Sequence, residues 1–201
     1  MKKYLFSLRS LALGGLLAAF AAVPAQAATA PVDTSICSNP LLTQPFVSAH
    51  DSNWYTLLPG ETPGNFNGAG WTLTGGARVV TTTQPGGSTT SVLDLPSGAE
   101  AVSPTICVTS AYPTARTMVR NVVGAEGVFF YVSYEGTSTW SVPKNTGQVH
   151  GANAAWTLAT SVNVQPYNTT GWQPMRITLI PGGKSSDFQL YNLYVDPHAR
   201  L

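Results

Sequence analysis

The chain has 201 residues, of which 9% are charged, with ten Lys and Arg residues against nine Asp and Glu residues. Three of the cations lie among the first nine residues, so the remainder has seven cations against nine anions and a net charge of −2. A mildly acidic chain without a Lys/Arg cluster argues against nucleic acid and anionic membrane surfaces as partners. Plentiful Gly, Pro, Ser and Thr disfavour long solvated helices and favour short strands joined by turns.

The N-terminus has the pattern of a secretory signal peptide. Positively charged residues precede an apolar run over residues 11–23, which is shorter than the roughly 20 residues that a membrane span needs. A proline and the small-residue pattern AQA follow this run, and they predict cleavage after Ala27, with cleavage after Ala30 as the alternative. We therefore predict a signal peptide at residues 1–27 and a protein secreted to the extracellular space.

The sequence contains two cysteines, Cys37 and Cys107. An even pair in an exported chain predicts one disulfide, and two free buried thiols are the alternative. Chain entropy limits the stabilisation from such a bridge to roughly 4 kcal/mol. Residues 28–45 contain three prolines and predict an irregular lead-in that Cys37 ties to the rest of the chain. Residues 46–201 are enough for a single domain with one core.

Strand-like runs recur every 8 to 14 residues after the lead-in, separated by turns rich in Gly and Pro. The most apolar run, GVFFYVSYE at 127–135, predicts a central strand. So many antiparallel strands cannot form one open sheet without exposing an apolar face, so we predict an all-β, two-sheet β-sandwich (jelly roll). The predicted strands cover residues 53–58, 70–74, 77–83, 91–95, 101–111, 116–123, 127–135, 138–142, 156–164, 171–180 and 188–195.

Two segments of the mature chain resemble a known group of proteins. The first has NWYTLLPG at 53–60, NFNG at 65–68 and GWTLTGGA at 70–77, and the second is FQLYNLYVDP at 188–197. Together they resemble uncharacterised secreted bacterial proteins of the galactose-binding-like type, which includes many carbohydrate-binding modules. The resemblance implies a jelly roll and suggests sugar binding.

The resemblance also raises the question of a structural calcium ion. Modules of this type commonly hold calcium with carboxylates in the first and closing strands, where this chain has Asn67 and the pair Tyr191 and Asn192. Calcium takes six to eight oxygen ligands, usually including anionic ones. Because amides replace carboxylates here, we expect no cofactor, and Asn67 and Asn192 stay as weak calcium candidates.

The sequence contains no recognisable catalytic set. Glycoside hydrolysis needs two carboxylates about 5 to 10 Å apart. Glu126 and Glu135 bracket the predicted central strand and would be separated by roughly 30 Å along it. There is no Gly-x-Ser-x-Gly motif, and the three histidines lack metal-ligand spacing. We expect a non-catalytic protein, and a pairing of Glu135 with Asp94 across strands stays open.

Aromatic and polar residues gather near two tryptophans in the second half of the chain. Sugar rings stack their C–H faces on Trp or Tyr, while their hydroxyls bind amide, carboxylate and guanidinium groups. Trp140 and Trp156 flank the polar segment 144–153, which we predict to be a loop. The alternative for each tryptophan is core packing. The predicted ligand site consists of Trp140, Trp156, Tyr134, Glu135, Arg120, Asn121, Gln148 and His150.

The sequence therefore predicts a secreted, monomeric, non-catalytic β-sandwich that binds carbohydrate or a cell-surface glycan. Two alternatives remain open: a structural or cell-surface interaction protein without a small ligand, and a small glycan-active enzyme. The sugar-site prediction fails if Trp140 and Trp156 are both buried.

Overall fold

The computed structural model describes most of the chain beyond the predicted leader. The described residues are 32–37, 39–84, 87–137, 139–166 and 171–197. The predicted signal peptide at residues 1–27 lies outside them, as does its cleavage site. Within these ranges, no helix is long and apolar enough to cross a membrane.

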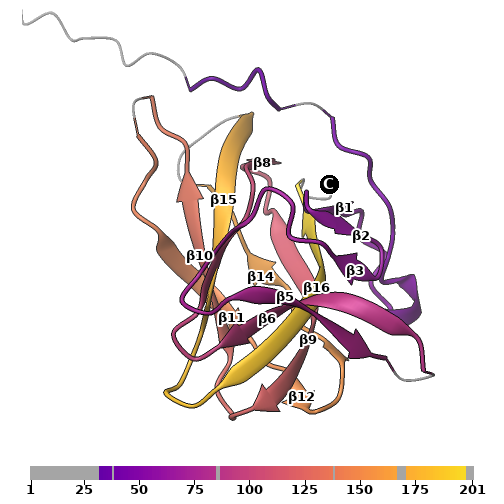
Figure 1. The fold of residues 1–201 in the computed structure, drawn as a ribbon. Helices are drawn as coiled ribbons and strands as arrows, with labels where there is room; N and C mark the ends of the chain where they lie inside the picture. Colours follow the sequence, from indigo (N-terminus) through magenta and orange to yellow (C-terminus); the bar gives the residue numbers. More distant parts are fainter. Residues whose placement is uncertain (1–31, 38, 85–86, 138, 167–170, 198–201) are drawn as a thin grey trace, which may run out of the picture.

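The strands form two main sheets, as predicted, and the fold is an all-β sandwich of the jelly-roll kind (Figure 1). The larger sheet has eight strands in the order β12-β9-β16-β6-β5, with β1 pairing β16 and with β13 and β14 pairing β9. Its strands are β1 (Thr56–Leu57), β5 (Arg78–Thr83), β6 (Thr89–Pro96), β9 (Thr114–Val123), β12 (Ala152–Asn153), β13 (Thr157–Leu158), β14 (Val162–Asn163) and β16 (Asp187–Asp196).

The smaller sheet has six strands in the order β11-β10-β15-β7-β4, with β8 also pairing β15. The predicted central strand is β10, which has a neighbour on each side. A separate hairpin of β2 (Glu61–Thr62) and β3 (Asn65–Phe66) and a short 3-10 helix, η1 (Val47–Ala49), complete the described elements. The strands of the smaller sheet are β4 (Thr72–Thr74), β7 (Glu100–Val102), β8 (Ile106–Thr109), β10 (Val128–Tyr134), β11 (Lys144–Val149) and β15 (Trp172–Pro181).

The core lies between the two sheets and is built from alternate residues of their strands. Phe130 of β10 pairs with Leu179 of β15, and both side chains are fully buried. Phe188 and Leu190 of β16 face them from the other sheet. Burial of each such side chain stabilises the fold by about 1.5–3 kcal/mol relative to its exposure. The alternation of buried and outer residues therefore sets which side chains reach the outer faces.

The structure differs from the predicted strands where local sequence signals are weak. The predicted strand 101–111 divides into β7 and β8 around Pro104, which has no N–H for a sheet ladder. The predicted loop 144–153 instead contains β11 and β12. Val149 is the one buried residue of β11, and the others are polar or glycine, so this edge strand lacks the apolar alternation by which strands are recognised. Of the predicted strand 138–142, the described residues 139–142 form one bridge, between Trp140 and Glu135.

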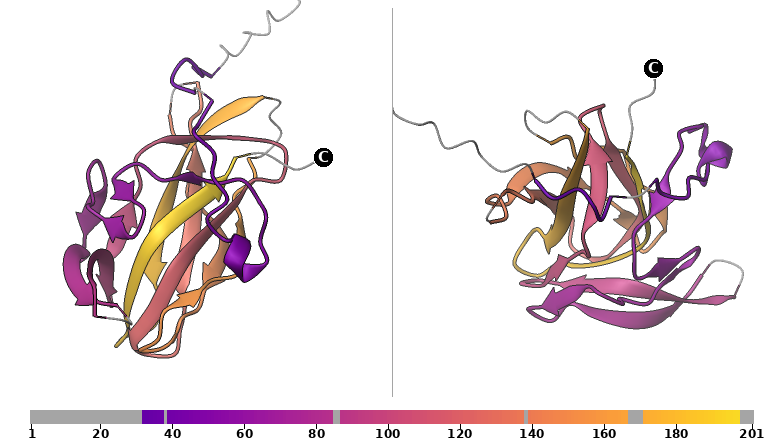
Figure 2. Two further views of the ribbon diagram at one scale, coloured as in Figure 1. Left: turned by 90° about the vertical axis from the view of Figure 1, so that its right-hand side faces the viewer. Right: turned by 90° about the horizontal axis from the view of Figure 1, so that it is seen from above.

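The predicted disulfide between Cys37 and Cys107 is confirmed, with the two Cα atoms 5.5 Å apart. It ties the lead-in to β8. The lead-in then runs along the outside of the sandwich to η1, as Figure 2 shows in indigo and purple. Beyond η1, Asp51 accepts a hydrogen bond of 2.7 Å from the Tyr55 hydroxyl and forms an ion pair with Arg116 of β9. These contacts attach the segment to the eight-stranded sheet.

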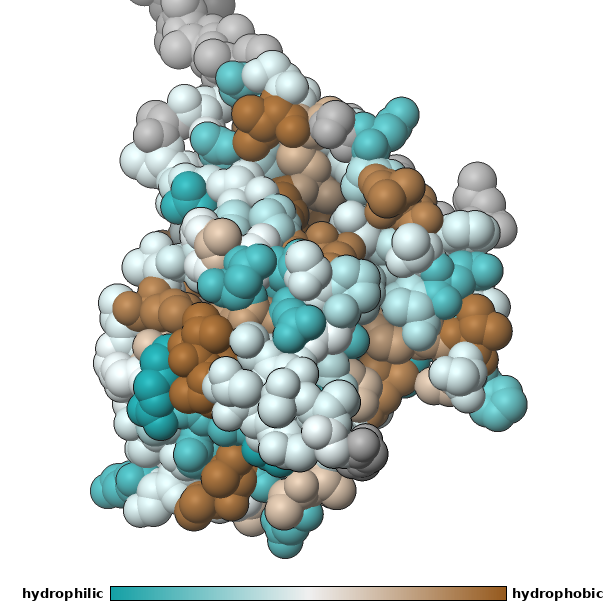
Figure 3. Space-filling view, turned by 45° about the vertical axis from the view of Figure 1, so that its right-hand side comes forward, coloured by the Kyte–Doolittle hydropathy of each residue, from teal (hydrophilic) through white to brown (hydrophobic). Residues whose placement is uncertain are grey.

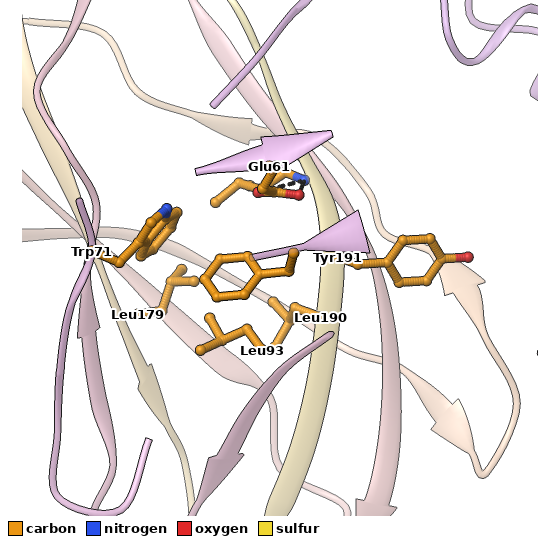
Figure 4. Close-up of a pocket in the computed structure, with 8 residues that line it drawn as sticks. Glu61, Trp71, Leu93, Leu179, Leu190 and Tyr191 are labelled. Carbon is orange, nitrogen blue, oxygen red and sulfur yellow. Dashed lines mark hydrogen bonds between the residues drawn. The ribbon is translucent and has the colours of Figure 1, made fainter. Parts of the chain in front are cut away.

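The β2–β3 hairpin brings a carboxylate against one end of the core (Figure 4). Both carboxylate oxygens of Glu61 accept the backbone N–H of Leu193, at 3.1 and 3.2 Å. The ladder between β16 and β9 is irregular between Tyr191 and Tyr194, so the carboxylate bonds an amide within the break. Burial raises the pKa of Glu61 to about 8, and the hydrogen bonds from the backbone offset only part of that effect. The surrounding pocket is too small for a water molecule and is also lined by Phe66, Trp71, Leu93, Leu179, Leu190, Tyr191 and Leu193.

We expect the stability of the protein to fall as the pH rises from 5 to 8, and Glu61→Gln to remove most of that slope. The pKa of Glu61 is higher in the folded protein than its ordinary value of 4.5, so the folded state binds more protons between these values. One such group contributes a slope of at most about 1.4 kcal/mol per pH unit. Urea unfolding at several pH values measures the slope of the free energy of unfolding against pH. Glu100→Gln, at an exposed position, is the control, and equal slopes in both variants would contradict the assignment.

Candidate functional site

The structure divides the predicted site residues between the two sheets. Tyr134, Glu135 and Trp140 lie at one end of the six-stranded sheet, where β10 ends. Arg120 and Asn121 belong to β9 of the eight-stranded sheet, and Trp156 lies just before β13 of the same sheet. Gln148 is exposed on β11 and His150 is exposed immediately after it. Neither Trp140 nor Trp156 is fully buried, and the eight residues do not form one cluster.

Trp140 lies at the junction of two open hollows. The backbones of Glu135 and Trp140 form a bridge that closes the intervening turn, and the Glu135 N–H donates to the Pro174 carbonyl at 3.0 Å. One hollow holds about 340 Å³ and the other about 140 Å³. We call the two together the Trp140 groove. Its lining residues are Val32, Tyr134, Glu135, Gly136, Thr137, Thr139, Trp140, Ser141 and Gln173.

Arg176 of β15 supports the indole ring of Trp140. Its guanidinium carbon lies 4.0 Å from the ring centroid, and its Nε donates to Thr105 Oγ1 at 3.2 Å. A guanidinium over an indole face is attracted by the negative electron density of the ring. Arg176 is not among the site residues that the sequence predicts. Its alternation with Met175 and Ile177 places it on the outer face of the sheet, but no sequence signal connects it with Trp140.

The polar groups around the groove have defined partners. Gln173 donates from its Nε2 to the Glu135 carbonyl at 2.7 Å, and Ser141 Oγ accepts the Tyr134 N–H at 2.9 Å. The Tyr134 hydroxyl lies near two carbonyls, those of Val164 at 2.9 Å and Gln165 at 2.7 Å. Burial raises the pKa of Tyr134 well above its ordinary range. Tyr134 therefore contributes a wall of the groove rather than a free hydroxyl.

The outer face of the eight-stranded sheet contains a row of polar side chains across four strands. Arg78, Asp94, Gln189 and Arg120 are successive cross-strand neighbours on β5, β6, β16 and β9. Arg78 forms an ion pair with Asp94, and Gln189 donates to Asp94 Oδ1 at 2.8 Å. Arg120 donates from its Nε to Gln189 Oε1 at 2.9 Å. Each side chain of the row therefore bonds the next one.

This face of the sheet is covered by its own side chains. Arg120 also donates to Thr82 Oγ1 at 2.6 Å, although β6 and β16 separate their strands, so the sheet must curl strongly toward this face. Asp94 and Gln189 are consequently only 1% and 8% exposed. Trp156 closes the same face, with Arg120 4.9 Å from its ring centroid and the Tyr191 ring 4.6 Å away. The geometry favours packing as the role of Trp156.

Neither Asp187 with Asp94 nor Glu135 with Asp94 forms the open pair of carboxylates that glycoside hydrolysis needs. Burial followed by the negative charge of Asp94 raises the pKa of Asp187. Asp94 is itself buried and bonded by Arg78 and Gln189, so this pair is not open to a sugar ring. Glu135 and Asp94, the pair left open by the sequence, belong to opposite sheets.

The two calcium candidates bond the backbone around the β2–β3 hairpin. Asn67 Oδ1 accepts the Ala69 N–H at 2.8 Å, and Asn192 Oδ1 accepts the Gly64 N–H at 2.7 Å. Gly64 is in the turn of the hairpin, whereas Asn67 follows its open end, so the fold does not bring the two amides together. Asn121, on β9, accepts the Gly151 N–H at 3.0 Å. Among the described residues there is no group of three or more His, Cys, Asp and Glu side chains arranged to hold a metal ion.

The fold resembles solved carbohydrate-binding modules at low sequence identity. A CBM22-1 xylan-binding domain from Xyn10C of Paenibacillus barcinonensis matches at 12% identity over 66% of this chain and 88% of that chain, with a TM-score of 0.46. TmCBM61, solved with β-1,4-galactotriose, matches at 11% identity over 69% and 96%, with a TM-score of 0.42. CsCBM6-3 from Clostridium stercorarium, solved with cellobiose, matches at 13% identity over 64% and 87%, with a TM-score of 0.39. No protein-family model and no curated protein matches the sequence.

We expect Asp94→Ala to destabilise the protein by about 1–3 kcal/mol, because Gln189 would lose the acceptor of its buried amide. Arg78 adds little to this cost because more than half of its side chain is exposed. Equilibrium urea unfolding measures the change in the free energy of unfolding. Glu100→Ala is the matched control at an exposed position. If the two variants are equally stable, the polar row does not hold this face together.

Proposed function

We propose that the protein is a secreted, non-catalytic β-sandwich that binds a glycan in the Trp140 groove. The observation that supports this proposal is a half-buried tryptophan beside two open hollows, with Arg176 against its ring. Sugar-binding sites combine an aromatic surface for the C–H face of a ring with a few fixed polar groups for the hydroxyls.

Arg176 limits how a sugar can stack on Trp140. A ring with a guanidinium 4.0 Å from its centroid offers only its other face to a ligand. The bond from Arg176 to Thr105 holds the guanidinium, and the backbone bridge to Glu135 holds the tryptophan. A stacking surface fixed in advance loses little conformational entropy on binding.

The polar rim of the groove suits an uncharged sugar. Glu135 provides a carboxylate, Thr139 and Ser141 provide hydroxyls, and the backbone adds carbonyl and N–H groups. The positive charge of Arg176 is balanced by the negative charge of Glu135. We therefore propose a neutral glycan rather than a polyanion as the ligand, with hydroxyl groups that bond the rim while a C–H face contacts Trp140.

We expect Trp140→Ala to abolish retention of the protein by the glycan it binds, because the substitution removes the stacking surface. A glycan array identifies the ligand, and affinity electrophoresis in gels containing that polysaccharide measures retention. Trp54→Ala is the matched control, since Trp54 is 49% exposed in the segment between η1 and β1, outside the groove. The proposal fails if no glycan retains the wild-type protein, or if Trp140→Ala is retained as strongly as Trp54→Ala.

One observation favours the alternative of a surface interaction protein. Large apolar side chains are exposed in the lead-in and in the segment before β1, among them Leu41, Val47 and Trp54. On the face shown in Figure 3, however, apolar side chains form patches separated by polar ones. Self-association of a wild-type protein that binds no glycan, detected by sedimentation, would favour this alternative.

A further inference from the structure

The segment Val32–Cys37, which we call the strap, makes no strand pairing with the body of the protein. The hydrogen bonds recorded for these described residues are internal: the Ser35 N–H donates to Asp33 Oδ1, and the Cys37 N–H donates to the Thr34 carbonyl, both at 2.9 Å. The disulfide from Cys37 to Cys107 is therefore the defined link between the strap and the sandwich.

The strap is not packed tightly onto the sheet beneath it. A hollow of about 230 Å³ lies between the lead-in and the body, next to the disulfide. This volume is several times the roughly 30 Å³ that a water molecule occupies in the liquid. Ile36, at the edge of the hollow, is 58% exposed. Apolar packing therefore contributes little to holding the strap. The hollow is lined by Ile36, Pro40, Thr56, Leu57, Pro59, Thr105, Ile106 and Cys107.

The other end of the strap reaches the candidate ligand site. Val32 lines the larger hollow of the Trp140 groove, together with Trp140 and Gln173. The strand to which the disulfide attaches the strap also supports this groove. Cys107 pairs with Pro174 in the ladder between β8 and β15, and the Pro174 carbonyl accepts the N–H of Glu135. The disulfide thus joins the strap to the strands that position the groove.

We propose that the strap is a wall of the Trp140 groove and that the Cys37–Cys107 disulfide holds it there, so the groove is complete only in the oxidised protein. A dithiol reductant would transfer two electrons and two protons to the bridge, giving two thiols and the cyclic disulfide of the reductant, and would release the strap. The groove would then be completed after export, in an oxidising compartment. This inference rests on the proposed function, which makes the Trp140 groove the ligand site. Its test needs no glycan.

The experiment measures acrylamide quenching of Trp140 fluorescence in the oxidised protein and after reduction with dithiothreitol. Subtraction of the signal of a Trp140→Phe variant isolates Trp140 from the other four tryptophans. We expect the quenching constant of Trp140 to rise severalfold on reduction. Hydrogen exchange in β6 and β16 should stay far slower than in an unfolded chain, which shows that the core remains folded. An unchanged quenching constant in a reduced protein with an intact core would overturn the proposal.

A second pair of variants decides the question if reduction unfolds the whole protein. Val32→Gly keeps the disulfide and removes the side chain that lines the groove, so Trp140 should become more accessible to acrylamide. Ile36→Gly is the matched control, because it places a glycine in the same strap but removes a side chain that lines the separate hollow beside the disulfide. Equal quenching of Trp140 in the two variants would refute the strap as a wall. Failure to bind glycan would refute only the proposed function.

Discussion

The arrangement of the protein depends on the burial of one face of each sheet against the other. The core side chains of β10 and β15 include Phe130 and Leu179, which are fully buried and are direct cross-strand neighbours. The same register brings Ser133 beside Arg176 on the outer face. A shift of one residue would turn the guanidinium of Arg176 into the core, at a prohibitive desolvation cost. The support of Trp140 by Arg176 is therefore a consequence of core packing.

The outer faces of the two sheets contain similar side chains but differ in what those side chains can do. On the eight-stranded sheet, Arg120 reaches Thr82 across two intervening strands, and the resulting curl buries Asp94 and Gln189. Their polar groups bond one another and stabilise the shape of the sheet. On the six-stranded sheet, Trp140 lines open hollows and Arg176 lies against its ring. The pair of Arg120 and Trp156 therefore packs the outer face of the eight-stranded sheet, whereas the pair of Arg176 and Trp140 leaves room for a ligand.

Much of the fold could be predicted because alternation and turn residues are local signals. Strands β9, β10, β15 and β16 fall close to their predicted ranges. Burial alternates along most of β9, whereas β15 and β16 contain runs of three or more buried residues. Strand β11 could not be recognised in the same way, because its residues are mostly polar and its pairing with β10 supplies the reason for its conformation. The β2–β3 hairpin was missed because each of its strands has only two residues.

The sequence by itself determined the all-β class and the disulfide. It also placed Glu135 and Trp140 in one candidate site, because these two residues lie close together in the chain. With two cysteines only one intramolecular pairing exists, and Glu135 and Trp140 are separated by a single short turn. Only the tertiary structure decided that Trp140 and Trp156 belong to opposite sheets and that Arg176 and Val32 join the groove. Those relations depend on strand order, register and sheet curl. Such long-range contacts arise from burial of the whole core, and no local pattern of residues encodes them.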